Sequence, residues 1–166
     1  MARARYEIEI LATPEKVFAY MDDINNVGWH MSGESSMPMM GSRLRLEVID
    51  DKKGIGATYR WKGSVMNMPI DIKETVTKWI KNREKTWQTI GKPKMIVMSG
   101  YVMHLRVSPT EKGTKVFFEI DYSLPKTPWG WIIGVILARK YAKWCLQRAC
   151  EDTKRALESR TAQKTA

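Results

Sequence analysis

The chain has 166 residues, of which 43% are hydrophobic and 28% charged. This length and composition predict a single soluble globular domain whose core is large enough to fold without disulfides or a metal. The formal net charge of +10 admits nucleic acid or anionic lipid as a partner. However, the basic residues are scattered through turns and alternating segments, and no helix-turn-helix, zinc-finger or aromatic ribonucleoprotein pattern is present, which argues against nucleic acid.

The cellular location is inferred from the N-terminal residues and the cysteines. The first six residues carry charges with no apolar run after them, so no signal peptide is expected. Cys145 and Cys150 are five positions apart on a predicted helix, about 140° around its axis, so they cannot pair with each other there. Free thiols without an export signal predict a cytoplasmic protein.

The first third of the chain predicts one strand and short helices. Apolar and polar residues alternate over residues 5–11, which indicates a half-buried antiparallel strand. Thr13 as N-cap and Pro14 at the first helical position then predict a short helix over residues 16–22. Residues 23–42 show no clear period and include His30, so we expect a short second helix or a loop near an opening.

The middle of the chain predicts about six antiparallel strands. Segments with period-two alternation recur between turn residues, and a Gly-Lys-Pro sequence at residues 91–93 is expected to interrupt one of them. The predicted strands cover residues 43–49, 57–66, 70–80, 85–90, 95–107 and 114–124.

The last element is a long helix over residues 129–160. Thr127 and Pro128 form a helix start, and 26 residues without Pro or Gly follow Gly134. The helix is apolar all round up to Ala138 and amphipathic beyond it. Its apolar half therefore needs a partner on every side, which could be the core, a bound apolar ligand or a membrane surface. Ten apolar residues are too few to cross a bilayer, which takes about 20.

The element order predicts an α+β architecture in which the terminal helix covers the apolar face of an antiparallel sheet. If the sheet curls around the helix, a cavity opens between them, because one helix about 10 Å wide cannot fill a strongly curved sheet. Such a cavity is where a ligand would bind.

Five segments of the sequence resemble those of the SRPBCC superfamily, the helix-grip group that includes START domains and the polyketide cyclase/dehydrase family. They are residues 12–20, 54–59, 74–79, 113–116 and 121–125, followed by the long helix. The resemblance implies a curved antiparallel sheet of about six to seven strands around the C-terminal helix, with two short helices after the first strand. It also implies one START-like ligand-binding domain over residues 1–166, with a core at about 3–160, a short polar tail, and a deep cavity for lipids, sterols or polyketides.

Inward-facing aromatic, aliphatic and methionine side chains form the predicted ligand-binding set. Methionine is flexible and polarizable, so the 11 methionines of the chain suit either an irregular core or a cavity for a bulky ligand. A thioether copper site at residues 37–40 lacks a nearby Cys or paired His. The set comprises Tyr59, Trp61, Met66, Met68, Ile72, Glu74, Val97, Tyr101, Met103, Phe118, Ile120, Trp131, Val135 and Tyr141.

Glu74 is the polar residue most out of place. Alternation directs its carboxylate inward, where an unpaired charge is costly and the pKa would rise. It could orient a ligand hydroxyl, act as a general base, or pair with an inward Arg60. A strand bulge that turns Glu74 to solvent is the alternative.

Three functions remain open, and no catalytic residue is assigned. A carrier or binder of an apolar small molecule is favoured, because no Gly-x-Ser-x-Gly motif is present and His30 and His104 are too separated to indicate a metal site. An aromatase/cyclase-type enzyme would use Glu74, Tyr59 or His30 to move protons. A lipid-transfer protein would make transient contact with a membrane through the apolar start of the helix and the basic surface. We expect no cofactor and no metal.

Overall fold

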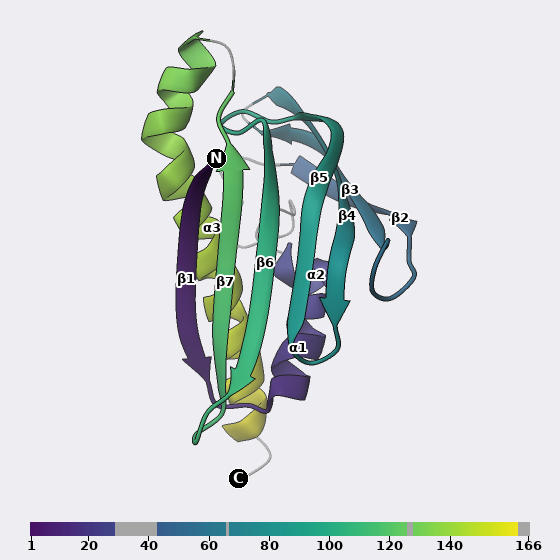
Figure 1. Ribbon diagram of the computed structural model, residues 1–166, viewed down its shortest axis with the longest axis vertical. Coiled ribbons are helices and arrows are strands. Elements are labelled where there is room, and N and C mark those ends of the chain that lie inside the picture. The colour runs from purple at the N-terminus through teal and green to yellow at the C-terminus, as the bar shows by residue number, and fades with distance from the viewer. Residues whose placement is uncertain (29–42, 66, 126–127, 163–166) are drawn as a thin grey trace.

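The computed structural model describes residues 1–28, 43–65, 67–125 and 128–162 (Figure 1), and within these the side chains of residues 43, 128–134, 136 and 160–162 are not described. It confirms the predicted α+β helix-grip architecture. Seven antiparallel strands form one sheet in the order β1-β7-β6-β5-β4-β3-β2, and one long helix lies along it.

The strands follow the predicted segments closely. They are β1 (Ala2–Ile10), β2 (Arg43–Asp50), β3 (Thr58–Val65), β4 (Met68–Ile80), β5 (Glu84–Lys94), β6 (Gly100–Pro109) and β7 (Thr114–Ser123). The helices are α1 (Pro14–Asp22), α2 (Ile24–Val27) and α3 (Pro128–Ala162). Thr13 occupies the N-cap position of α1 and Pro14 the first helical position, as predicted, although the Thr13 side chain makes no capping hydrogen bond.

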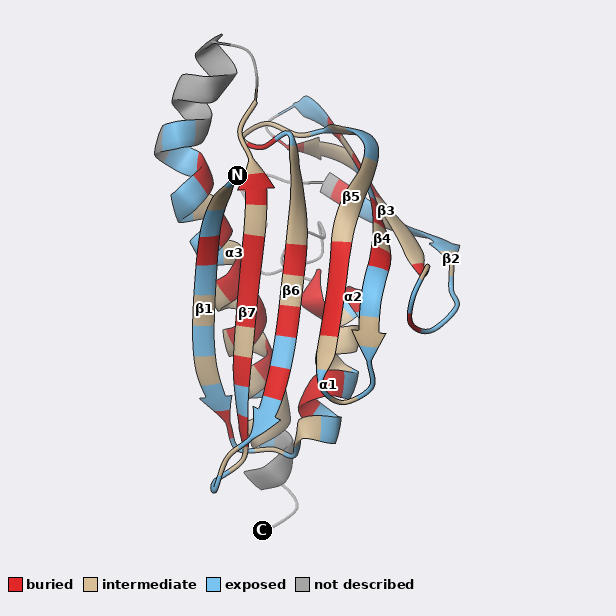
Figure 2. Cartoon of the chain, viewed as in Figure 1, coloured by how far each residue is buried: buried red, intermediate tan, exposed pale blue. Residues whose placement is uncertain are grey.

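Alternation along β7 shows why the sheet has one apolar face. Val116, Phe118, Ile120 and Tyr122 are all buried, and they share the face that meets the helix. The neighbours β1 and β6 run antiparallel to β7 on either side, with Ile8 opposite Val116 and Met103 opposite Ile120. The central strands therefore carry the main core, as the buried bands in Figure 2 show.

Small residues allow α3 to lie close to the sheet. Ala138, Ala142, Leu146 and Ala149 recur at helical spacing and are buried. The helix runs along β1 and β7 and contacts α1 and α2 as well. Its first turns extend past the ends of β1 and β7 (Figure 1). Among the described residues, no helix has a stretch that is long and apolar enough to span a bilayer.

The predicted interruption at residues 91–93 is wrong. Strand β5 continues to Lys94, and the extra residues form a bulge, because Lys94 pairs with Asp71 while Ile90 pairs with Lys73. Gly91 takes a φ of +73° there, a conformation that glycine adopts without strain. The predicted strand over 95–107 is correspondingly too long, since β6 begins only at Gly100 and residues 95–99 form bends.

Candidate functional site

A cavity of about 80 Å³ lies between α3 and the inner face of the sheet. The sheet contributes large side chains from five adjacent strands, because inward-facing positions of neighbouring strands stand side by side on one face. They include Trp61 from β3, Ile72 and Glu74 from β4, Trp87 from β5, Met103 from β6 and Phe118 from β7. Apart from Glu74 and the Tyr101 hydroxyl, the described residues of this wall are apolar or aromatic.

The opposite wall comes from α3 and α2. Tyr141, Ala142 and Cys145 face the cavity from the middle of α3, because they lie on the helix face that meets the sheet. Ile24 and Gly28 close the space from α2. A side chain at Gly28 would overlap the indole of Trp61, so glycine there permits the close approach of α2 to the sheet.

Glu74 is the polar centre of the cavity. Its residue is 2% exposed, which confirms that it points inward rather than being turned out by a bulge. The indole Nε1 of Trp61 donates a hydrogen bond to Oε2 at 3.2 Å, and the hydroxyl of Tyr101 donates to Oε1. Burial raises the pKa of the Glu74 carboxyl, and hydrogen bonds from Tyr101 and Trp61 and the charge of Lys85 offset part of that rise.

The other titratable groups of the lining stay protonated. Burial, followed by the Glu74 charge, raises the pKa of Tyr101 well above its ordinary value. Burial does the same for the phenol of Tyr141 and raises the pKa of the Cys145 thiol to about 12. The described lining therefore presents one carboxyl acceptor among neutral O–H and S–H groups.

The structure places most of the predicted ligand-binding residues on the lining. Tyr59, Met68, Val97 and Val135 are not among the lining residues. Met68 and Val135 are 42% and 49% exposed, the latter because this part of α3 extends beyond the sheet. His30, Met66 and the side chain of Trp131 lie outside the described residues. On the lining are Trp61, Ile72, Glu74, Tyr101, Met103, Phe118, Ile120 and Tyr141.

Sequence reasoning missed several lining residues. Met98 is 2% exposed and lines the cavity in place of Val97, because residues 95–99 do not follow the strand period. Trp87 was the inward residue of a correctly predicted strand, and its size was the available signal. The α2 contributions at Ile24 and Gly28 had no periodic signal, since α2 has only four residues.

A second, polar groove lies beside the cavity, between α1, α2 and the turns that join β2 to β3 and β4 to β5. Its volume is about 540 Å³, and Tyr59, Trp79 and Lys85 line it. The buried Lys85 ammonium donates to the main-chain oxygen of Asp22 at 2.6 Å and pairs with its carboxylate at 2.8 Å. Tyr59 lies opposite Glu74 in the strand register, but it lines the groove and not the cavity. Arg60 pairs with Asp71, so the predicted Arg60–Glu74 pair is not formed.

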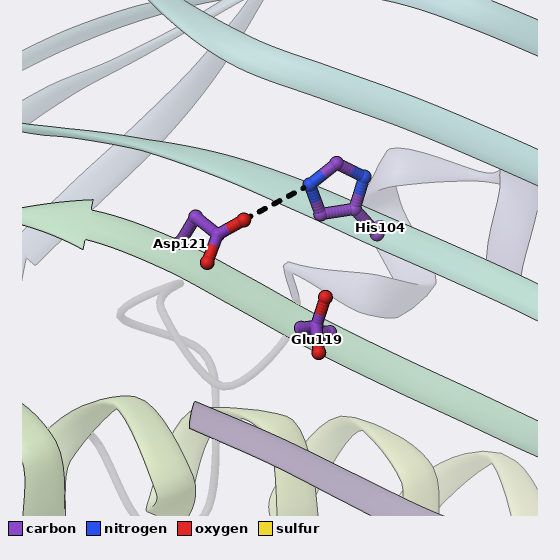
Figure 3. Close-up of side chains that lie close together, drawn as sticks. All are labelled: His104, Glu119 and Asp121. Carbon is purple, nitrogen blue, oxygen red and sulfur yellow. Dashed lines mark ion pairs between the residues drawn. The ribbon is translucent and has the colours of Figure 1, made fainter. Parts of the chain in front are cut away.

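A cluster on the outer face of the sheet contains the second predicted histidine. His104 on β6 stands opposite Glu119 on β7, and its Nε2 is 3.5 Å from Asp121 (Figure 3). In the described part of the chain this is the one group of three metal-ligand side chains that lie close together. The Arg3 guanidinium pairs with Asp121 at 2.6 Å and lies 3.7 Å from Glu119. The protein thus supplies its own cation to these carboxylates.

Comparison with known proteins identifies the type of fold. A family model described as "Polyketide cyclase / dehydrase and lipid transport" matches residues 1–158. No curated protein matches the chain. Among solved structures, TTHA0849 from Thermus thermophilus is similar with a TM-score of 0.62 at 20% identity, over 99% of this chain and 100% of that one.

Two further solved structures share the fold. The di-domain ARO/CYC StfQ from the steffimycin biosynthetic pathway gives a TM-score of 0.70 at 13% identity over 96% of this chain, which spans only 52% of StfQ. Ara h 8.0201 gives a TM-score of 0.64 at 10% identity, over 95% of this chain and 98% of that one. At such identities these likenesses show the fold alone.

Proposed function

Because the chain belongs to the polyketide cyclase/dehydrase and lipid transport family, within the SRPBCC superfamily that it resembles, we propose that it binds or carries an apolar small molecule. The ligand, of lipid, sterol-like or polyketide-like type, lies in the cavity between α3 and the sheet. The observation that carries the proposal is the lining itself, which is apolar and aromatic around one buried carboxyl. Residues 1–166 act as a single ligand-binding domain.

Burial of apolar surface supplies the affinity. Each 100 Å² of ligand surface removed from water contributes about 2.5 kcal/mol before the costs of association. The empty cavity of about 80 Å³ holds only part of a lipid-sized molecule. Met95, Met98 and Met103 line it, and the flexible thioether side chain can change rotamer to widen the space. We place the protein in the cytoplasm because both of its cysteines are free thiols.

A cyclase-type enzyme is the second candidate, and the Glu74–Tyr101 pair favours it. A carboxyl with a raised pKa beside a phenol can take up and return a proton in a closed, apolar site. Loss of turnover with retained binding in Glu74→Gln would support this function. Loss of turnover and of binding together in this variant would assign Glu74 to binding alone.

Transient membrane contact is the third candidate. Val135 and Leu137 are exposed on α3, and the nearby Arg139, Lys140 and Lys143 are exposed as well. Apolar side chains beside basic ones suit an anionic lipid surface. Sedimentation with phosphatidylserine vesicles that weakens at higher salt is the expected result. Equally strong binding to neutral vesicles would contradict this membrane contact.

Uptake of a neutral fluorescent probe, N-phenyl-1-naphthylamine, tests cavity binding directly. Trp87 lines the cavity and Trp79 lines the polar groove, so the two form a matched pair of energy donors. We expect saturable uptake, with energy transfer to the probe that falls in Trp87→Phe more than in Trp79→Phe. Absence of uptake, or an equal loss in both variants, would contradict cavity binding.

A further inference from the structure

The described lining of the cavity has a carboxyl acceptor but no cationic side chain. Glu74 is the single carboxylic acid among the described lining residues, and no Lys, Arg or His is among them. Lys85 is the buried cation that acts on Glu74 from a distance, but its ammonium is committed to Asp22 through a hydrogen bond and an ion pair. A polar group of a ligand that enters the cavity therefore meets the Glu74 carboxyl, and the described lining offers that group no Lys, Arg or His of its own, since the Lys85 charge acts on Glu74 from outside the lining.

The hydrogen bonds at Glu74 leave room for one more donor. An ionised carboxylate has about four acceptor positions on its two oxygens. Trp61 donates to one oxygen and Tyr101 to the other, and a further hydrogen bond from Trp87 also lowers the pKa of the carboxyl, so three partners hold the group as an acceptor. The remaining acceptor position belongs to a side chain that is 2% exposed and lines the cavity.

This arrangement discriminates between ligand head groups. A hydroxyl or ammonium donates a hydrogen bond to the buried carboxylate, and such charge-assisted bonds are the stronger ones. A carboxylate, phosphate or sulfate would place a second negative charge beside the first in a desolvated site. The aromatic ring of Trp61 on the same lining also favours a donor or a cation over an anion, whereas the Trp87 ring already has the Lys85 ammonium 5.4 Å from its centroid.

Building on the binding function above, we propose that the ligand carries an O–H or N–H donor on an apolar body, docks that donor on Glu74, and that anionic lipids such as fatty acids are rejected. The cavity then selects a ligand by its hydrogen-bond donor as well as by its apolar body. Anionic lipids are excluded even where their apolar bodies would fit.

Three ten-carbon compounds that differ only in their head group test this selectivity at neutral pH. Decanol, decylamine and decanoate are each used to displace N-phenyl-1-naphthylamine from the wild-type protein. We expect decanol or decylamine, or both, to compete at concentrations at least about 10-fold lower than decanoate. A larger advantage for decylamine assigns a cationic head, and a larger one for decanol assigns a neutral hydroxyl.

Variants locate the effect at Glu74. In Glu74→Gln the difference in competing concentration between decanol or decylamine and decanoate is expected to shrink to less than about 3-fold, because the carboxyl is gone while the shape of the side chain is kept. Glu119→Gln makes the same chemical change on a buried residue of the outer face, and the preference should remain. The wild-type comparison stands even if a variant fails to fold.

The outcomes separate the inference from the proposed function. Equal competition by all three molecules, or a preference for decanoate, would overturn the inference and leave cavity binding intact. A preference unchanged in folded Glu74→Gln would overturn it too. Failure of the probe to bind wild-type protein would overturn the proposed function, and the inference with it.

Discussion

Filling the cavity from α3 should stabilise the protein and abolish its binding. Ala142 is 1% exposed and lines the cavity, whereas Ala138, one helical turn earlier, is fully buried and does not line it. Leucine and alanine are both strong helix formers, so Ala142→Leu changes packing without disturbing α3. The added isopropyl group enters the empty space.

The magnitude follows from the cavity volume. At about 24 cal/mol per Å³, an unfilled space of about 80 Å³ costs about 2 kcal/mol. We therefore expect Ala142→Leu to raise the free energy of unfolding by about 1–2 kcal/mol, the gain being reduced by imperfect fit. Ala138→Leu has no space to fill, so overpacking should lower the free energy of unfolding by about 1–3 kcal/mol.

Urea denaturation and probe titration on the same two variants provide the assay. Ala142→Leu should be more stable and bind N-phenyl-1-naphthylamine at least about 10-fold more weakly, a trade of function for stability. If Ala142→Leu is as destabilised as Ala138→Leu, or if it binds the probe like wild type, the space beside Ala142 is not the ligand site.

Three further predictions concern the cavity walls. Burial raises the pKa of Glu74 in the folded state, so its cost to stability grows as pH rises through the ordinary carboxyl range. Urea denaturation of Glu74→Gln should show a gain in stability over wild type at pH 7 that vanishes at pH 4, and an equal gain at both pH values would refute this. Gly28→Ala should lower the free energy of unfolding by about 1–3 kcal/mol because its Cβ would overlap Trp61, and an unchanged Tm would contradict that contact. Burial raises the pKa values of Cys145 and Cys150 to about 12, so both thiols should resist Ellman's reagent at pH 8 until guanidinium unfolds the chain, and fast native reaction would show that they are accessible.

Local patterns predicted the fold because each element carries its own period. In β7, alternation alone placed Val116, Phe118 and Ile120 inward, and all three are buried. Pro125 before α3, Pro128 at its first position and the unbroken run after Gly134 likewise defined the long helix. These signals depend on neighbours in sequence, so one chain is enough to show them.

The site was harder to predict because it depends on contacts between distant segments. Alternation correctly turned Glu74 inward, but its partners Trp61 and Tyr101 come from β3 and β6 and meet it only through the register and curvature of the sheet. Residues 95–99 leave the strand period between β5 and β6, so that Met98 and not Val97 lines the cavity. The alternation of the sequence continues through these residues and does not show where the strand stops.

The most direct test of the central claim is native mass spectrometry of the protein purified from its own host, followed by denaturing extraction of any bound molecule. A cavity that binds apolar ligands predicts a stoichiometric apolar species in wild-type protein and its loss from Ala142→Leu. A protein that is empty, and that also takes up no apolar probe, would contradict the claim that the space between α3 and the sheet is a binding site.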